Sequence, residues 1–239
     1  IYKFIYLNIT LSPLEVDGFY SFLQYLVVSY ALIIRISGIF HLCLGILGLF
    51  GFNLPKIFDN YFFASSFSNL WQRINIYWKD ALMKVVYYPI YFKLKGKLST
   101  QNVLIISIIV LFLVNWLYHS FQWFWIKGDL PYLPLDLTFW GIFGFTVLIN
   151  SLYSHNKRQK RSLTPNATSL KTNIYAVAKP IGMFFFMCLL WMIWTSSSVS
   201  EWLYLMTHIG SGTIENWLVF ISIVSIVFCL ALLIPHRLG

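Results

Sequence analysis

The run from Leu98 to Ile126 contains no Asp, Glu, Lys or Arg. About 20 apolar residues cross the hydrocarbon core of a bilayer as a helix, so this run is long enough to span a membrane. An earlier pair of runs, Gly18–Ile34 and Ile36–Pro55, is interrupted by Arg35 and fits either two spans or one long kinked helix. The pattern predicts an all-α, polytopic transmembrane protein. The other charge-free windows of this size are Leu137–Asn156, Pro180–Ser200 and Asn216–His236.

Composition supports a membrane location. The 239-residue chain is 59% hydrophobic and 10% charged, whereas soluble domains carry about 25% charged residues. Aromatic residues make up 20% of the chain, and Trp and Tyr collect at membrane interfaces. The formal net charge is +9. We attribute this charge to membrane orientation and attraction to anionic lipid, and we expect no nucleic-acid partner.

Basic residues predict the orientation of the spans, because loops rich in Lys and Arg stay in the cytoplasm. Lys93, Lys95 and Lys97 precede the first long run, and a basic segment lies between the Leu137–Asn156 and Pro180–Ser200 windows. We therefore expect loop 155–171 and the C-terminal Arg237 to lie on the cytoplasmic side.

Residues 56–97 are aromatic-rich but carry charges every few residues. This pattern favours amphipathic or partly re-entrant helices at the cytoplasmic interface, arranged around a central cavity. Ser68 or Asn69 is a candidate N-cap for a helix that Pro89 should end or kink. The sequence contains no repeats, and we expect residues 1–239 to form a single transmembrane domain.

The residue types that bind metals do not occur in metal-binding patterns. Cys43, Cys188 and Cys229 all fall in apolar runs and are expected to act as small buried hydrophobes. No Cys-x-x-Cys or His-Glu-x-x-His motif occurs. We expect no metal site.

Several polar residues are out of place in the first long run. Asn115, His119 and Gln122 are spaced i, i+4 and i+7 and so share one helical face. Polar groups at membrane depth are costly and often functional, although an imidazole can also serve as a hydrogen bond between helices. The stripe suggests a wet or substrate-filled cavity, and its position alone leaves both interpretations open.

Residues 35–92 resemble the middle of membrane-bound O-acyltransferases, the MBOAT family, and in particular its bacterial polysaccharide-modifying branch. Residues in the order Ser37-Gly38, Gly45, Gly51-Phe52 and Pro55 match the first motif of that branch. "LWQRIN", residues 70–75, resembles the family's F-W-R-R-W-H segment, and Tyr88-Pro89 follows at the expected distance. "WLYHSF", residues 116–121, is similar to the second histidine motif, W-H-G. The resemblance is best over residues 20–130.

The chain also departs from this pattern. His41 stands where the branch has Asp, and Ser120 replaces the Gly after the second histidine. Asn75 stands where the branch has the first histidine, as in the eukaryotic members that acylate sterols, glycerides or proteins. Because the family is usually near twice this length, we expect the N-terminal half of its helical core to be missing here.

The resemblance implies an acyltransferase that moves an acyl group from a cytoplasmic thioester, acyl-CoA or acyl carrier protein, to a hydroxyl acceptor such as a cell-envelope glycan. It implies the bacterial inner membrane as the location, accessory envelope proteins as partners, and no bound cofactor. His119 would be the general base, and Asn75 would orient the donor thioester or the imidazole. Neutral imidazole suits deprotonation of a hydroxyl near pH 7. Expected substrate-binding residues are Trp71, Arg73, Gln122 and Asn115.

Two other function classes remain open from the residues. A haem-binding membrane subunit could use His41 and His119 as axial ligands. A non-catalytic scaffold or transport subunit could use the same polar residues to line a path through the membrane. For the acyltransferase, we expect Asn75 and His119 to converge on one cavity that opens to the cytoplasm and is lined by Trp71, Trp116 and Trp123.

Overall fold

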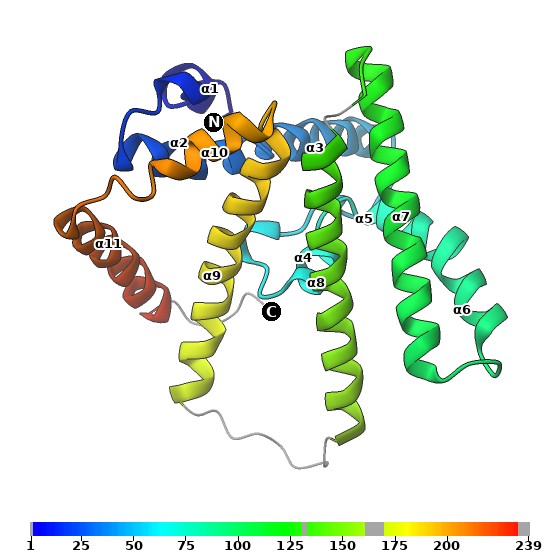
Figure 1. Cartoon of the computed structure of the whole chain (residues 1–239). Helices are drawn as coiled ribbons and strands as arrows, with labels where there is room; N and C mark the ends of the chain where they lie inside the picture. Colours follow the sequence, from blue (N-terminus) through cyan, green and yellow to red (C-terminus); the bar gives the residue numbers. More distant parts are fainter. Residues whose placement is uncertain (1, 131–132, 161–169, 234–239) are drawn as a thin grey trace. The chain divides into compact units, whose positions relative to one another are not determined.

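The computed structural model describes residues 2–130, 133–160 and 170–233 (Figure 1). The prediction of an all-α chain is confirmed, since an isolated bridge between Lys95 and Leu98 is the one β-type pairing recorded in these ranges. The elements are α1(Tyr2–Asn8), η1(Pro13–Glu15), α2(Phe19–Ala31), α3(Ile34–Leu49), η2(Tyr61–Phe63), α4(Phe67–Arg73), α5(Ile76–Leu82), η3(Met83–Tyr87), α6(Tyr88–Leu94), α7(Thr100–Lys127), α8(Leu133–Lys160), α9(Leu170–Thr195), α10(Val199–Thr207) and α11(Ile214–Leu233).

Four segments in the described part of the chain are long and apolar enough to cross a membrane, as expected for a polytopic protein. The last predicted window corresponds to α11, whose apolar stretch Ile214–Leu230 is shorter than the others. The predicted window Pro180–Ser200 starts later than the helix observed there. The reason is that α9 already includes Lys179 and continues through Pro180. The four candidate spans are Phe19–Leu49, Thr100–Lys127, Pro134–Lys157 and Ile174–Thr195.

The first of these spans contains a break. The chain is helical in α2 and again in α3, and the two residues between them, Leu32 and Ile33, form a turn. Leu32 N still donates to Val28 O at 3.0 Å, and Ile33 N donates to Tyr30 O at 3.1 Å. The interruption expected near Arg35 therefore lies two to three residues earlier.

Residues 56–97 form several short helices instead of one long one. The N-cap of α4 is Ser66, whose side chain accepts from Asn69 N, so the expected caps at Ser68 and Asn69 were wrong. That helix ends at Arg73, well before Pro89. Pro89 lies in the first turn of α6, directly after the π-helical turn η3. Proline has no N–H to donate, and the wider π turn accommodates that loss without ending the helix.

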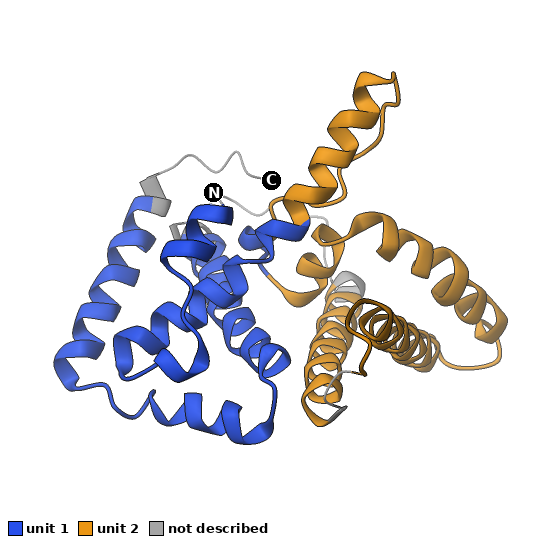
Figure 2. Cartoon of the chain, turned by 90° about the horizontal axis from the view of Figure 1, so that it is seen from above, with its two compact units in different colours: residues 1–36, 62–65, 165–239 blue, residues 37–61, 66–164 orange. Residues whose placement is uncertain are grey.

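The described chain divides into two compact units that are interleaved along the sequence (Figure 2). Unit 1 comprises residues 1–36, 62–65 and 165–239, and unit 2 comprises residues 37–61 and 66–164. In unit 1, α2 and α11 both pack on α9. Tyr30 is buried there, with edge contacts to Phe62, Phe184 and Trp191 at ring-centroid distances of 5.5, 5.5 and 5.6 Å.

Unit 2 is built around α7 and α8, which lie side by side and run in opposite directions (Figure 1). Ser99 caps the start of α7 by accepting from Asn102 N at 3.3 Å, and Gly128 ends it with a positive φ of 83°. The two helices approach closely at Gly144, where an added Cβ would lie 3.0 Å from Phe112 Cγ. The short helix α4 packs on α8, and η3 and α6 pack on α7.

Several predictions concern residues that the structure does not describe. Residues 161–169 of the expected cytoplasmic loop 155–171, and Arg237, lie outside the described residues. The orientation of the spans therefore stays a prediction. The expectation of a single domain for residues 1–239 also stays a prediction.

Candidate functional site

His119 lies on α7, eight residues before its end, and is half-buried. Its imidazole stacks on the indole of Trp140 from α8, with ring centroids 4.6 Å apart and planes 24° apart. The edge of Tyr118 contacts the imidazole as well. The ring is therefore held in one orientation by an aromatic neighbour across the helix interface.

Asp136 is a feature that the sequence analysis missed. It lies in the first turn of α8 and is only 4% exposed. Its Oδ2 accepts from Trp116 Nε1 at 2.6 Å and from Ser120 Oγ at 3.3 Å. These two donors come from the same turn of α7 as His119. A buried carboxylate thus lies beside the candidate base.

Asn115, one helical turn before His119, is fully buried. Its Oδ1 accepts from Trp78 Nε1 at 2.9 Å. An indole N–H can only donate, so this bond fixes which end of the amide faces Trp78. The Asn115 Nδ2 is left buried without a hydrogen-bond partner among the described residues. A buried unpaired donor is costly and calls for an explanation, such as a ligand or a bound water.

Asn75 links α4 to α5 in the left-handed conformation, with φ 44° and ψ 57°. Asn tolerates this region better than most residues, which gives a structural reason for an amide here. The half-buried side chain makes no capping hydrogen bond to α5. Three residues later, Trp78 bonds Asn115 and stacks on Tyr118 with ring centroids 3.8 Å apart. The helix that begins at Asn75 is therefore fixed to the turn of α7 that precedes His119.

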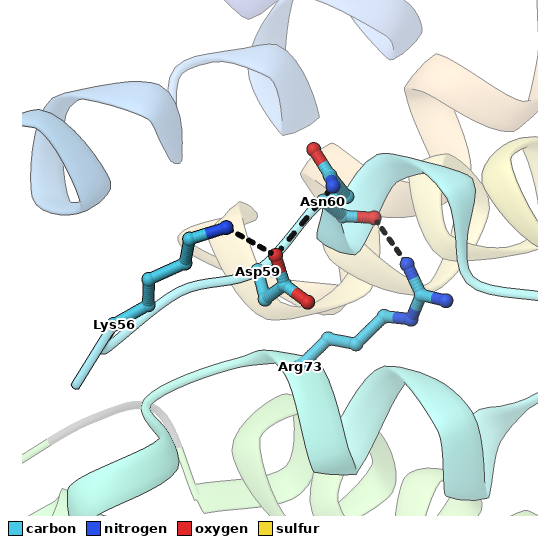
Figure 3. Close-up of polar contacts among 4 residues, drawn as sticks. All are labelled: Lys56, Asp59, Asn60 and Arg73. Carbon is cyan, nitrogen blue, oxygen red and sulfur yellow. Dashed lines mark hydrogen bonds and ion pairs between the residues drawn. The ribbon is translucent and has the colours of Figure 1, made fainter. Parts of the chain in front are cut away.

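Arg73 holds the loop that precedes α4 (Figure 3). Its Nη1 donates to Asn60 O at 3.2 Å, and its own carbonyl accepts from Asp59 N at 3.0 Å. Lys56 Nζ lies 3.4 Å from Asp59 Oδ1 in the same loop. Ile76 N donates to Ile57 O at 2.8 Å and adds a further tie to this loop. These contacts fix the backbone on both sides of Asn75, so Arg73 has a structural task whether or not it binds substrate.

Trp71 lines a cavity of about 510 Å³ within unit 2. Its walls come from α4, from the segment α5–η3 and from α7 and α8. Its lining combines rings and aliphatic groups with a charged pair, Lys79 Nζ and Asp80 Oδ1, 2.7 Å apart. Burial raises the pKa of the Tyr87 phenol in this wall, as do Tyr91 and Tyr88, so the hydroxyl stays a donor near neutral pH.

The α7 wall of this cavity consists of Leu104, Ile108 and Leu111, in the first half of the helix. Leu111 is one turn from Asn115 and two turns from His119, about 12 Å along the helix axis. The cavity therefore lies next to the polar stripe on α7, on the side of Lys97 and of the predicted cytoplasmic loops. His119 and Asn75 are not among its lining residues.

The other predicted site residues are placed differently. Gln122 is exposed, so the stripe of Asn115, His119 and Gln122 begins fully buried and ends on the surface. Trp116 lines a separate apolar groove of about 230 Å³ between α7 and α8. Trp123 is 39% exposed, with Lys127 Nζ 5.2 Å from its ring centroid. Of the three tryptophans expected around one cavity, Trp71 lines the 510 Å³ cavity that contains Lys79 and Asp80, and Trp116 and Trp123 do not line it.

The residues of the haem alternative lie in different surroundings. His41 is exposed on α3, and its Nδ1 is 2.7 Å from the carbonyl oxygen of Ser37. The face of the His119 ring is covered by Trp140. No group of three or more His, Cys, Asp and Glu side chains suited to a metal occurs in the described ranges.

The site combines the half-buried imidazole of His119, the amide N–H of Asn115 one turn away and the carboxylate of Asp136, which is bonded to the turn that carries His119. Such a set can accept a proton, donate to a carbonyl oxygen and favour a positive charge on the imidazole. In comparisons with known proteins, no family model, no curated protein and no solved structure matches the chain.

Proposed function

We propose that the chain is a membrane-embedded O-acyltransferase of the MBOAT type, in which His119 is the general base. The observation that carries this proposal is the pair on one face of α7. The buried Nδ2 of Asn115 has no partner among the described residues, and His119 lies one turn further along. Acyl transfer needs above all a base and a fixed N–H that donates to the carbonyl oxygen of the substrate. Here the two groups are about 6 Å apart along the helix.

The chemistry assigns one task to each group. The imidazole of His119 takes the proton of the acceptor hydroxyl while the oxygen attacks the carbonyl carbon of the thioester. Asn115 Nδ2 donates to the carbonyl oxygen as negative charge develops on it. The C–S bond then breaks, and the imidazolium returns its proton to the leaving thiolate. An oxyanion donor of this kind is worth about 3 kcal/mol of transition-state stabilisation.

The donor thioester would enter through the cavity lined by Trp71, Lys79 and Tyr87. This cavity is large enough for an extended thioester arm and ends one turn from Asn115. Asn75 would orient the donor or the imidazole, since the helix that it begins is tied to Asn115 through Trp78. The donor would be acyl-CoA or the thioester of an acyl carrier protein, and no resident cofactor is needed.

For the acceptor we propose a hydroxyl of a cell-envelope glycan, with accessory envelope proteins as partners. The location would be a bacterial inner membrane, with loop 155–171 and Arg237 on the cytoplasmic side. The distribution of Lys and Arg supports this orientation. Cysteine labelling tests it, with Lys160→Cys and Arg237→Cys introduced one at a time into a chain whose native cysteines are replaced. Thiol labels that reach the two positions from opposite faces of the membrane would contradict it.

The test of the proposal compares the whole chain with His119→Gln in membranes of cells that express it. Radiolabelled acyl-CoA or acyl carrier protein is the donor, and label in the envelope fraction is the readout. Loss of the base should lower transfer by about 10²- to 10⁴-fold while insertion is unchanged. Asn115→Ala should also lower it, by about 10²-fold.

The matched control is His41→Gln, because this histidine is exposed and bonds its own helix. It should keep wild-type transfer. Wild-type turnover in His119→Gln would show that the imidazole is a packing group. A Soret band in the purified protein that His41→Gln removes would favour the haem-binding alternative, and no transfer from any donor would favour a scaffold or transport subunit.

A further inference from the structure

Asp136 is a carboxylate buried between two membrane-crossing helices. It is 4% exposed, and it begins the span Pro134–Lys157. Removing a carboxylate from water is costly unless hydrogen-bond donors or opposite charges replace the water. The identity of those partners therefore indicates what the carboxylate does.

Two hydrogen bonds join the carboxylate to the turn of α7 that carries His119. Trp116 Nε1 and Ser120 Oγ donate to the same oxygen, Oδ2, at 2.6 and 3.3 Å. Trp116 precedes His119 by three residues and Ser120 follows it directly, so the carboxylate is bound on both sides of the imidazole along the chain. The position of this turn relative to α8 thus depends on Asp136.

A second contact comes from the next turn of α8. Trp140, four residues after Asp136, shares its helical face and stacks on His119 with ring centroids 4.6 Å apart. Asp136 also interacts electrostatically with His119. One face of α8 therefore supplies both the plane against which the imidazole rests and a negative charge near it.

A helix start alone would not explain this arrangement. A carboxylate in the first turn of a helix interacts favourably with the helix dipole, and an exposed side chain can do so as well. Here Asp136 is buried, and its oxygen takes donors from another helix. The contacts across the interface, and not the helix end, distinguish it.

We propose that Asp136 is a positioning residue for His119. Its carboxylate fixes the turn that carries the imidazole against Trp140, and its charge favours the imidazolium that forms when His119 accepts the acceptor's proton. This role rests on the proposed acyl transfer, but its electrostatic part exists in the resting protein and can be measured without turnover.

The test is Asp136→Asn in the whole chain. The amide oxygen of Asn can still accept from Trp116 and Ser120, so the shape is kept while the charge is lost. The readout is the rate at which diethyl pyrocarbonate modifies His119 between pH 3 and 8, measured by mass spectrometry. Since a nearby negative charge favours the protonated ring, its removal should move the midpoint of this curve to lower pH. Acyl transfer should fall about tenfold or more, with little change in KM.

Two variants serve as controls. Ser120→Ala removes one donor but keeps the charge, so the midpoint should stay. Asp129→Asn removes an exposed carboxylate outside both helices, and the midpoint should stay there too. An unchanged midpoint in folded Asp136→Asn would overturn the proposal, whatever its activity.

The two proposals can fail separately. A shifted midpoint in a chain that transfers no acyl group supports the pairing of Asp136 with His119 and overturns the acyltransferase. If Asp136→Asn does not fold, Trp116→Phe takes its place, because it frees the carboxylate from its shorter hydrogen bond. Transfer should then fall about fivefold or more at constant KM, and wild-type kcat would overturn the positioning role.

Discussion

The two compact units bury different kinds of side chain. In unit 1, the contacts among α2, α9 and α11 include ring pairs such as Tyr30 on Trp191 and Phe19 on Trp217. The buried polar residue described there is Ser196, whose Oγ bonds Met192 O in its own chain segment. In unit 2, α7 and α8 bury an amide and a carboxylate, Asn115 and Asp136.

This difference distinguishes side chains that hold helices together from side chains that could take part in a reaction. Helices in a bilayer associate through close packing, and hydrogen bonds between them add only about 0.6 kcal/mol on average. In unit 1 the side chains described as buried are hydrophobic, apart from Ser196. Unit 2 also buries polar groups that hydrogen-bond across its helix interfaces, and the candidate site lies among them.

The largest expected effect is in unit 1. Tyr30→Ala removes a ring with three aromatic neighbours and should lower the free energy of unfolding by about 3 to 5 kcal/mol. Unfolding of the detergent-solubilised protein measures it. Tyr30→Phe keeps the ring and should lose far less. An equal loss of stability in Tyr30→Phe would show that the hydroxyl, and not the ring, stabilises unit 1. The contrast drawn between the two units would then be wrong.

A smaller effect is expected where Trp78 meets Asn115. Trp78→Phe keeps a ring over Tyr118 but removes the N–H that Asn115 accepts. The whole amide is then buried and unpaired, which should cost about 1 to 3 kcal/mol. The same unfolding experiment measures it, with Trp123→Phe as the exposed control. Equal stability of the two variants would mean that water reaches Asn115.

Two further effects of similar size compare one glycine in each unit. An added Cβ at Gly212 would lie 2.5 Å from Phe19 Cδ2, whereas at Gly144 it would lie 3.0 Å from Phe112 Cγ. Both alanine variants are overpacked, and such changes cost about 1 to 3 kcal/mol. Gly212→Ala should lower the melting temperature more than Gly144→Ala. The reverse order would indicate that α7 and α8 are the more tightly constrained interface.

The spans could be predicted because they depend on the length and composition of continuous runs of the sequence. Charge-free length identifies α7 and α8 within a few residues of their observed ends, whereas the window for α9 starts ten residues late because the helix includes Lys179. The segment 56–97 could not be divided correctly, since its breaks depend on tertiary contacts. Arg73 ends α4 where its carbonyl accepts from Asp59, and the left-handed turn at Asn75 follows.

The candidate site was predictable in part. Helical spacing placed Asn115 and His119 on one face, and both are at least half-buried. The same spacing could not show that Gln122 reaches the surface, because the extent of α8 on that face is a property of packing. Asp136 was missed because a carboxylate at the edge of an apolar run is typical of a loop residue. The sequence did offer one signal: Asp136 lies four residues before Trp140, a spacing that would place both on one face of a helix.

The π turn η3 has a consequence for how the chain can vary in length. Such a turn is an α-helix with one residue inserted, and each residue turns the helix by about 100°. It lies where Met83, Lys84 and Tyr87 line the cavity, and Tyr88 separates it from Pro89. Deleting one residue between 83 and 87 would restore an α-helical register and rotate α6, while α4 and α5 keep their direction. Natural homologues that differ by one residue here would keep the Trp78–Asn115 contact and present a different face of α6 to α7.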